Sequence, residues 1–255
     1  EKMDIRFDGK VVLVTGASSG IGAAAAVEFA KSGAKVVVNY NATKSGADAV
    51  VGEIKSFGGD ALAIQADVTK KTEIKKMISE AAEAFGTIDI LFNNAGSLIE
   101  RKELELLSEE TWHSVINVNL TSCLLCAQAV IPMMKKKGYG RIINMTSIAA
   151  RNGGGRGAGH YSAAKAGVLT LTKSMAKELA GTGIQVNAVS PGVITTRYHD
   201  IFSSTEMRDN FKKAIPLSRE GGAEEVAYAV LFLASDFANY ILGETIEING
   251  GLLMD

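Results

Sequence analysis

The chain alternates short, β-branched apolar runs with helical segments along its whole length. The first run is residues 10–15, glycines bound it on both sides, and a small-residue helical segment follows at residues 21–32. Further strands are expected at residues 35–39, 61–65, 88–92, 141–145, 184–189 and 245–248, and further helices at residues 44–57, 72–85, 162–179 and 223–234. Apolar strands joined by crossover helices pair in parallel and are covered on both faces. The sequence therefore predicts the α/β fold class, with one doubly wound (Rossmann) parallel sheet of about seven strands and helices on both faces.

The domain organisation follows from the length and from the absence of a linker. The chain has 255 residues and no stretch rich in Pro or Ser that would divide it. We expect residues 1–255 to form a single domain, because α/β domains of this size are common. Residues 197–216 are polar, aperiodic and long for a connection, which predicts a lid over a binding site, with an ordinary surface loop as the alternative.

Charge and cysteine usage narrow the kinds of partner. Lys and Arg number 27 against 28 Asp and Glu, so no overall field attracts nucleic acid or an anionic membrane. The chain has two cysteines, Cys123 and Cys126, which is few for this length and indicates a reducing, cytoplasmic setting. The pair would supply only half of a four-ligand zinc site. Residues 111–134 lack charges and are long enough for a membrane span, but Asn119 and Pro132 would leave polar groups unpaired in hydrocarbon. We therefore expect no nucleic-acid or membrane partner, and a small-molecule ligand.

Three glycines lie where the first strand passes into the first helix. Gly16, Gly20 and Gly22 have the spacing G-x3-G-x-G. Glycine lets the backbone approach an anion closely, and a helix N-terminus offers unpaired N–H groups and the positive end of the helix dipole. Because the pyrophosphate of a dinucleotide binds at the first strand–helix turn of a doubly wound sheet, these glycines predict a dinucleotide site.

The same turn permits an interpretation from another class of enzyme. Residues 16–20 also satisfy G-x-S-x-G, in which Ser18 would be the nucleophile of a serine hydrolase. Such a serine needs an acid and then a histidine downstream. His113, His160 and His199 are the candidates, and none has a persuasive sequence context.

The end of the second strand bears on which dinucleotide binds. A carboxylate at that position holds the adenosine ribose diol and repels a 2′-phosphate. This chain has the neutral Asn39 at that position. Amide, hydroxyl and ammonium groups that can accommodate the phosphate follow it at Tyr40, Asn41, Thr43, Lys44 and Ser45. We therefore expect NADP(H) in preference to NAD(H), although Ser19 stands where a basic residue would strengthen the case.

Tyr161 and Lys165 are candidates for acid–base chemistry. Their i, i+4 spacing at the start of a predicted helix places both on one face. A cation about 4 Å from a phenol contributes roughly 4 kcal/mol at an effective dielectric near 20, which lowers the phenol's pKa from near 10 by about three units. Ser147 follows an expected strand at the carboxyl edge of the sheet, where its hydroxyl can hold a reacting oxygen. The set predicts proton transfer to or from a carbonyl or hydroxyl oxygen.

Taken together, these motifs resemble the short-chain dehydrogenase/reductase family over almost the whole chain. The similar elements are residues 15–22 (T-G-x3-G-x-G), residues 93–96 (N-N-A-G), Asn119, Ser147 with Tyr161-x3-Lys165, and Pro191-Gly192. The resemblance implies an NAD(P)(H)-dependent oxidoreductase that transfers hydride between nicotinamide and the carbon of a carbonyl or secondary alcohol.

The resemblance also implies roles for individual residues. Tyr161 would be the acid or base, Lys165 would bind the nicotinamide ribose, and Ser147 would polarise the carbonyl. Asn119 would hold a water molecule in a proton relay. The implied cofactor contacts are Gly16, Ser18, Ser19, Gly20, Ile21, Gly22, Asn39, Tyr40, Asp67, Val68, Asn93, Ala95, Gly96, Tyr161, Lys165, Pro191, Gly192, Ile194 and Thr196. No metal is expected, and family members are usually homotetramers or homodimers.

The resemblance leaves the substrate open. The family includes 3-oxoacyl-[acyl-carrier-protein] reductases, glucose dehydrogenase-like enzymes and reductases of sugars and small ketones. Carrier-using relatives have basic residues where this chain has Gly138 and Thr182, which weighs against an acidic carrier protein. The three lysines at residues 135–137 keep the carrier reductase as an alternative. A dinucleotide sensor without catalysis is disfavoured by the intact catalytic set.

Residues near the predicted catalytic set are expected to select the substrate. The loop between Ser147 and Tyr161 is rich in glycine and makes few fixed contacts, so it is expected to contribute little selectivity. Leu98, Ile99 and Arg151, together with the 197–216 segment, are the predicted determinants.

Overall fold

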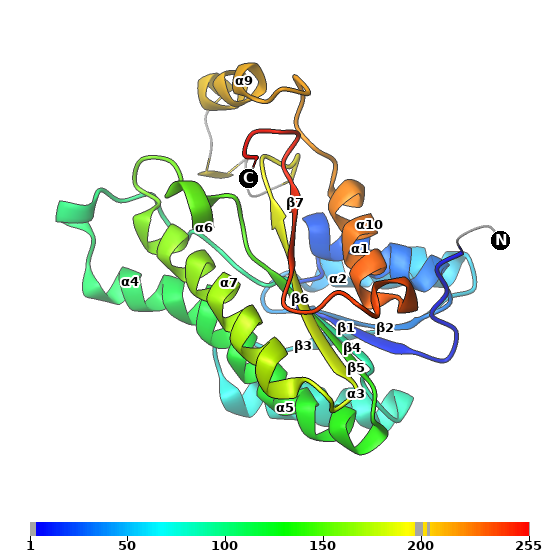
Figure 1. Ribbon diagram of the computed structural model, residues 1–255. Coiled ribbons are helices and arrows are strands. Elements are labelled where there is room, and N and C mark those ends of the chain that lie inside the picture. Colours follow the sequence, from blue (N-terminus) through cyan, green and yellow to red (C-terminus); the bar gives the residue numbers. More distant parts are fainter. Residues whose placement is uncertain (1–3, 197–200, 203–204, 255) are drawn as a thin grey trace.

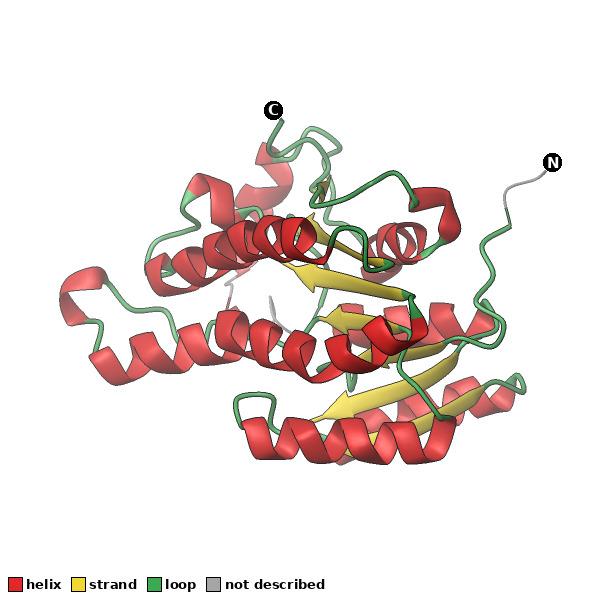
Figure 2. Ribbon diagram, turned by 60° about the horizontal axis from the view of Figure 1, so that its bottom comes forward, coloured by secondary structure: helices red, strands yellow, loops and turns green. Residues whose placement is uncertain are grey.

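Two helical layers enclose one parallel sheet (Figures 1 and 2). The computed structural model describes residues 4–196, 201–202 and 205–254, and within them seven parallel strands form a sheet of order β3-β2-β1-β4-β5-β6-β7. The strands are β1 (Val11–Val14), β2 (Lys35–Tyr40), β3 (Asp60–Gln65), β4 (Ile90–Asn93), β5 (Gly140–Met145), β6 (Ile184–Pro191) and β7 (Thr245–Ile248). The strand order reverses between β1 and β4, which places a crevice outside their carboxyl ends. The predicted α/β class and doubly wound sheet are confirmed.

The helices divide between the two faces of the sheet (Figure 2). One face is covered by α1 (Gly20–Lys31), α2 (Lys44–Ser56) and α10 (Ala223–Ala234), and the other by α3 (Lys71–Phe85), α5 (Ser122–Lys137) and α7 (Gly159–Leu179). The shorter elements are η1 (Leu104–Leu106), α4 (Glu109–Ile116), the π-helical turn η2 (Asn117–Thr121), α6 (Ala149–Asn152), α9 (Thr205–Ala214) and η3 (Asp236–Ala238).

The hydrophobic core lies in two parts because side chains of a strand alternate between the faces of the sheet. In β1, Val12 and Val14 pack in the layer with α1 and α10, whereas Val11 and Leu13 pack in the layer with α3 and α5. All four valine and leucine side chains are buried. The continuous apolar run that predicted a parallel strand is therefore explained by burial on both sides.

One helical stretch of the described chain, Glu109–Lys137, is long and apolar enough to cross a membrane by length and composition alone. In the fold it is interrupted at η2 and packs beside α3, α7 and the central strands. Side chains such as Cys126 and Val130 fill the core on that face. The apolar composition of this stretch is thus accounted for by contacts within the domain.

The segment predicted as a lid is only partly described. Residues 197–200 and 203–204 lie outside the described residues, and the remainder contains α9, drawn in orange beyond the carboxyl end of the sheet (Figure 1). Arg208 of α9 forms a bidentate ion pair with Glu220, at 2.8 Å from Nε and 2.5 Å from Nη2. The Thr195 hydroxyl also donates to Glu220, at 2.9 Å, so α9 is tied to the chain that follows β6.

Candidate active site

A cavity of about 450 Å³ lies at the carboxyl ends of the central strands. Its wall joins the glycine turn after β1 to the start of α7 and to the chain after β6. The sequence-predicted site residues that line it are Gly16, Ser19, Gly20, Ile21, Asn39, Asp67, Val68, Ala95, Gly96, Ser147, Tyr161, Lys165, Pro191, Gly192, Ile194 and Thr196. Those that are not in its wall are Ser18, Gly22, Tyr40, Asn93 and Asn119.

The three glycines of the turn are required by backbone conformation or by close neighbours. Gly16 and Gly20 adopt φ values of +62° and +58°, which disfavour residues with a Cβ atom. A Cβ on Gly22 would lie 2.5 Å from Nδ2 of Asn94 and 2.7 Å from the Gly16 carbonyl oxygen. Ser19 is the N-cap of α1 without a side-chain cap hydrogen bond, so the first N–H groups of the helix remain for a ligand at the cavity wall. This geometry suits a pyrophosphate.

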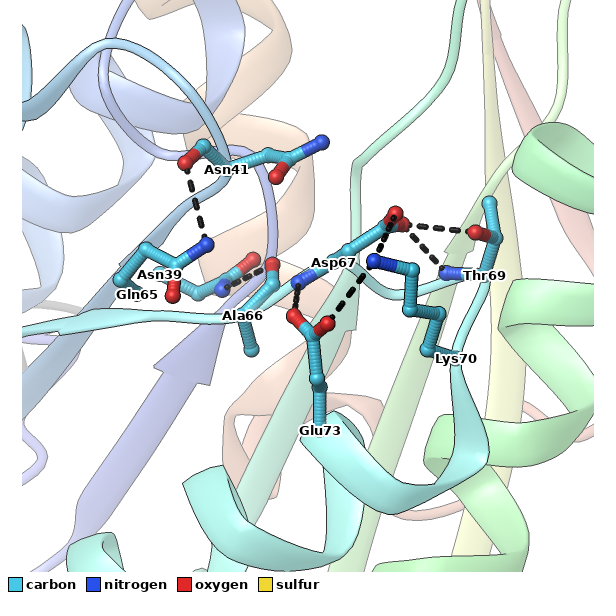
Figure 3. A network of polar contacts seen from close by, with 8 residues as sticks. All are labelled: Asn39, Asn41, Gln65, Ala66, Asp67, Thr69, Lys70 and Glu73. Carbon is cyan, nitrogen blue, oxygen red and sulfur yellow. Dashed lines mark hydrogen bonds and ion pairs between the residues drawn. The ribbon is translucent and has the colours of Figure 1, made fainter.

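Two asparagine side chains hold the glycine turn by hydrogen bonds to its backbone. Asn39 Oδ1 accepts from the Gly16 N–H at 3.1 Å, and its Nδ2 donates to the Ala66 carbonyl at 3.1 Å (Figure 3). Asn94 Nδ2 donates to the Thr15 and Gly16 carbonyls at 2.9 and 3.1 Å. These bonds fix the turn before any ligand binds.

The expected 2′-phosphate contacts from Asn39 and Lys44 are not formed by this arrangement. The Asn39 amide is 2% exposed and is committed to the backbone of the turn and of the chain after β3. Lys44 pairs with Asp48 at 2.7 Å and lies outside the cavity wall. The sequence showed that no acid ends β2 but could not show which way the Asn39 side chain turns.

Asp67 is the one acidic residue in the described cavity wall, and it lies at the predicted adenine end (Figure 3). Asp67 Oδ1 accepts from the Thr69 N–H and hydroxyl at 2.9 and 2.7 Å, and Lys70 lies 3.6 Å from Oδ2. Burial acts to raise the pKa of Asp67, but the Thr69 and Lys70 contacts outweigh it and hold the pKa below its usual range. Glu73 accepts from the Asp67 N–H at 2.7 Å, which fixes this loop at the cavity wall.

Helix α7 begins at Gly159, so Tyr161 and Lys165 lie in its first two turns. Lys165 Nζ is 5.6 Å from the centroid of the Tyr161 ring and donates to the Met145 carbonyl at 2.8 Å. Lys165 is 2% exposed, and burial lowers its pKa to about 8. The ammonium form therefore still predominates at neutral pH. Ser147, just after β5, lines the same cavity.

Asn119 lies behind the cavity wall, in the π-helical turn η2. Its Nδ2 donates to the Ser97 carbonyl at 2.6 Å and to the Val115 carbonyl at 2.9 Å. Its buried Oδ1 has no hydrogen-bond partner among the described residues. A Cβ on Gly96 would lie 2.5 Å from this oxygen and 3.2 Å from Lys165 Nζ, so both groups border one small space. A buried acceptor beside an ammonium group is a place for an ordered water molecule.

Asn93 supports the site from the core. Its Nδ2 donates to Asn144 Oδ1 at 2.9 Å and to the Cys123 carbonyl at 3.3 Å, and Asn144 donates to the Thr172 hydroxyl at 3.0 Å. This buried chain of hydrogen bonds joins β4, β5, α5 and α7 beneath the cavity. The position of Asn93 thus fits a role in holding the strands and helices together.

Neither described histidine is hydrogen-bonded to Ser18. His113 is 3.4 Å from Glu109 on the exposed side of α4. His160 is buried and contacts the Glu100 carbonyl through Nε2 at 3.1 Å. His199 lies outside the described residues.

The prediction of the substrate-selecting residues is largely wrong, because most of them do not line the cavity. Leu98 is fully buried, Ile99 is 45% exposed, and Arg151 pairs with Glu247 at 3.4 Å; none of the three lines the cavity. The wall instead contains Arg101, Asn152, Phe211 and Leu252, of which only Phe211 belongs to the predicted 197–216 segment. Nothing local in the sequence distinguishes these four, because loops far apart in the chain bring them together.

The residues present fit a nicotinamide dinucleotide. The glycine cradle excludes side chains from the anion position, and the helix N-terminus is open to a ligand. The orphaned Asn119 oxygen and the buried Lys165 ammonium lie near Tyr161 at the other end of the cavity. No cluster of His, Cys, Asp and Glu among the described residues suits a metal ion.

Comparison with known proteins agrees with this geometry. A family model described as enoyl-(acyl carrier protein) reductase matches residues 16–253. The 3-oxoacyl-[acyl-carrier-protein] reductase of Staphylococcus epidermidis is 46% identical over 245 residues, covering 96% of this chain and 99% of that protein. Its counterpart from Synechocystis is 47% identical over 252 residues, with 96% and 97% covered.

A solved structure agrees over the full length. It is that of a protein from Agrobacterium tumefaciens assigned as a gluconate dehydrogenase, with a TM-score of 0.93, 33% identity and 100% of both chains covered. The fold, the site and these similarities define an NAD(P)-dependent oxidoreductase. The chain belongs to the short-chain dehydrogenase/reductase family.

Proposed function

We propose that this enzyme exchanges hydride between NADP(H) and the carbon of a carbonyl or secondary alcohol, with Tyr161 as the acid–base group. The observation that supports this most is that Ser147, Tyr161 and Lys165 share one cavity with the glycine turn. Nicotinamide supplies or accepts the hydride when it is bound. The remaining chemistry belongs to side chains of this protein.

Each catalytic side chain has a distinct task in this proposal. In the reductive direction Tyr161 gives its proton to the carbonyl oxygen as the carbon accepts hydride, and the reverse transfer occurs in oxidation. Ser147 holds that oxygen by a hydrogen bond. Lys165 favours the phenolate by its charge and binds the nicotinamide ribose, and a water molecule on Asn119 Oδ1 returns the proton.

The proposed preference for NADP(H) rests on the end of β2. Asn39 replaces a carboxylate there, so no negative charge at this position repels a 2′-phosphate. Asn41 also lines this end of the cavity and offers a further amide. Because the Asn39 amide is engaged with the turn, the phosphate contacts are assigned to Asn41 and neighbouring backbone rather than to Asn39.

Calorimetric titration with NADPH and, separately, with NADH tests the cofactor assignment. We expect tighter binding of NADPH. Tighter binding of NADH would overturn the assignment at the end of β2, and failure of both to bind would contradict the oxidoreductase proposal.

Reduction of a 3-oxoacyl group on an acyl carrier protein is the second candidate, favoured by the names of the relatives at 46% and 47% identity. Gly138, which has φ of +67°, and Thr182 offer no cation for an acidic carrier, and Lys137 is bound to the buried Asp89. The test is turnover of a 3-oxoacyl thioester with and without the carrier. A gain from the carrier would establish this candidate, and equal rates would remove it.

We further propose a cytoplasmic homotetramer or homodimer. Strand β7 lies at one edge of the described sheet, and we assign contact with a second copy to this edge (Figure 1). Light scattering of the purified protein gives the assembly size directly.

A further inference from the structure

We propose that the substrate of this enzyme is an oxo or hydroxy acid whose carboxylate binds Arg101. The inference deepens the oxidoreductase function proposed above and rests on it. The cation that carries it, Arg101, is not among the residues predicted from the sequence.

Arg101 lies in the substrate part of the cavity. It lines the same cavity as Ser147 and Tyr161 and is partly buried. Its Nη1 is 3.5 Å from where a Cβ would stand on Gly155, in the loop that leads into α7. Arg101 follows β4, the central strand, whereas the predicted adenine contacts Asp67 and Val68 follow β3, an edge strand three positions away in the sheet. Arg101 therefore faces the space that a cofactor bound along the glycine turn leaves for the substrate.

The charge of Arg101 is not neutralised within the described part of the chain. Its Nε donates to the Phe202 carbonyl at 2.8 Å and its Nη1 to the Arg156 carbonyl at 3.1 Å. Carbonyl oxygens orient a guanidinium group but do not cancel its charge. The acidic neighbours are engaged elsewhere, since Glu100 accepts from the Thr111 hydroxyl at 3.0 Å and Glu103 pairs with Arg156 at 2.6 Å.

The cavity wall offers no other partner for this cation. The charged side chains among its described lining residues are Asp67, Arg101 and Lys165. Asp67 is held by Thr69 and Lys70 at the adenine end, and Lys165 is buried beside Tyr161. The substrate part of the wall is therefore positively charged, and guanidinium groups bind carboxylates by charge-assisted, bidentate hydrogen bonds.

The position of Arg101 is fixed from both sides. His160, buried next to Tyr161 in α7, contacts the Glu100 carbonyl at 3.1 Å. The Lys102 N–H donates to the Gly157 carbonyl at 3.0 Å. The residue that carries the cation is thus fastened to the same helix start that carries the catalytic tyrosine, which suits a group that sets the distance from the carboxylate to the reacting carbon.

The test compares acids with neutral partners of the same skeleton. Acetoacetate and acetoacetamide are assayed with NADPH, and gluconate and glucitol with NADP⁺. Ethyl acetoacetate, a neutral 3-oxo ester, reports hydride transfer without an anion. The variants are Arg101→Gln, Arg101→Lys and, as a matched control on the facing loop, Arg156→Gln, whose side chain is exposed and outside the cavity wall. NADPH affinity and the melting temperature confirm that each variant is folded.

We expect the acid of at least one pair to have a kcat/KM at least 10-fold above that of its neutral partner. Arg101→Gln should remove this preference, Arg101→Lys should keep part of it, and Arg156→Gln should leave it unchanged. Equal kcat/KM values within both pairs, or a preference for the acid that survives Arg101→Gln, would overturn the inference. Turnover of ethyl acetoacetate in the same experiment would show that the oxidoreductase function itself stands.

If no substrate is turned over, a binding measurement tests whether Arg101 binds a carboxylate. Calorimetric titration of the enzyme–NADPH complex should show that gluconate binds at least 10-fold more tightly than glucitol. This difference should be absent in Arg101→Gln. Equal binding of the two would overturn the inference. Failure of hydride transfer from every substrate, with carboxylate binding intact, would count against the proposed function alone.

Discussion

Replacing Glu220 by Gln should release α9 from the rest of the domain. The Glu220 carboxylate is only 5% exposed, and its Arg208 partner is 22% exposed. Hydrogen bonds from Arg208, assisted by Thr195, lower the pKa of Glu220 from 4.5 to about 2. Since one pKa unit corresponds to about 1.4 kcal/mol, the native contacts favour the carboxylate by roughly 3 kcal/mol.

The amide variant keeps the shape of the side chain but loses its charge. Arg208 can regain water because it is partly exposed, so we expect α9 to lose about 2 kcal/mol of local stability rather than the full amount. Hydrogen exchange of the α9 amides should accelerate by roughly 30-fold, with α10 as the unaffected internal reference. Because Phe211 of α9 lines the cavity, KM should rise as well.

Glu225→Gln is the matched control. Contacts with Arg219 and the Gly222 N–H lower the pKa of Glu225 to about 2 as well, but its side chain is 42% exposed and solvent screens the pair. Exchange in α9 should change little in this variant. Unchanged α9 exchange in Glu220→Gln, or equal effects of the two variants, would refute the argument from burial.

The same ion pair predicts a pH dependence. The folded-state pKa of Glu220 is depressed, so its contribution is complete above pH 4.5 and is lost as the pH falls toward 2. In the original protein, protection of the α9 amides against hydrogen exchange should decline as the pH falls from 4.5 toward 2. In Glu220→Gln this pH-dependent decline should be absent.

Three further predictions concern two residues of the cavity wall and the two buried cysteines. Gly96→Ala should lower kcat about 100-fold with the fold retained, because the new Cβ would lie 2.5 Å from Asn119 Oδ1, whereas Gly52→Ala, with nothing within 4 Å, should leave kcat unchanged. Lys165→Met should abolish turnover yet raise the free energy of unfolding by about 2 kcal/mol at pH 7. Burial lowers the folded-state pKa of Lys165 to about 8, so its charge destabilises the folded state. This penalty is complete below pH 8 and falls to zero as the pH rises to 10.5, and urea denaturation should show the stabilisation of Lys165→Met vanish over the same range. The two buried cysteines, whose pKa values burial raises, should react with a thiol reagent only after unfolding.

The fold, and the grouping of the predicted catalytic residues in one cavity, could be predicted from the sequence because their signals are local. Apolar runs such as β1 reveal strands buried on both faces, and the spacing of Tyr161 and Lys165 alone places them on one face of α7. The turn at Gly16 and Gly20 likewise carries its own geometry.

Contacts between distant segments could not be predicted in this way. Asn39 turns inward to bind the Gly16 N–H, a choice set by the packing of β2 against the chain after β3 and invisible in the residue itself. Arg101 reaches the cavity because its loop is bound to the Gly157 carbonyl and to His160. Leu98 and Ile99 lie near Arg101 in the sequence but outside the wall, so proximity along the chain was a poor guide there.

Turnover and cofactor affinity of Tyr161→Phe together test the central claim most directly. The substitution removes only the hydroxyl that is proposed to carry the proton, on a helix whose other contacts stay in place. We predict that the variant binds NADPH with the affinity of the original enzyme, measured by calorimetry, and loses at least 100-fold in kcat with any carbonyl substrate that the original enzyme reduces. Turnover that persists within a few-fold of the original rate would contradict Tyr161 as the acid–base group.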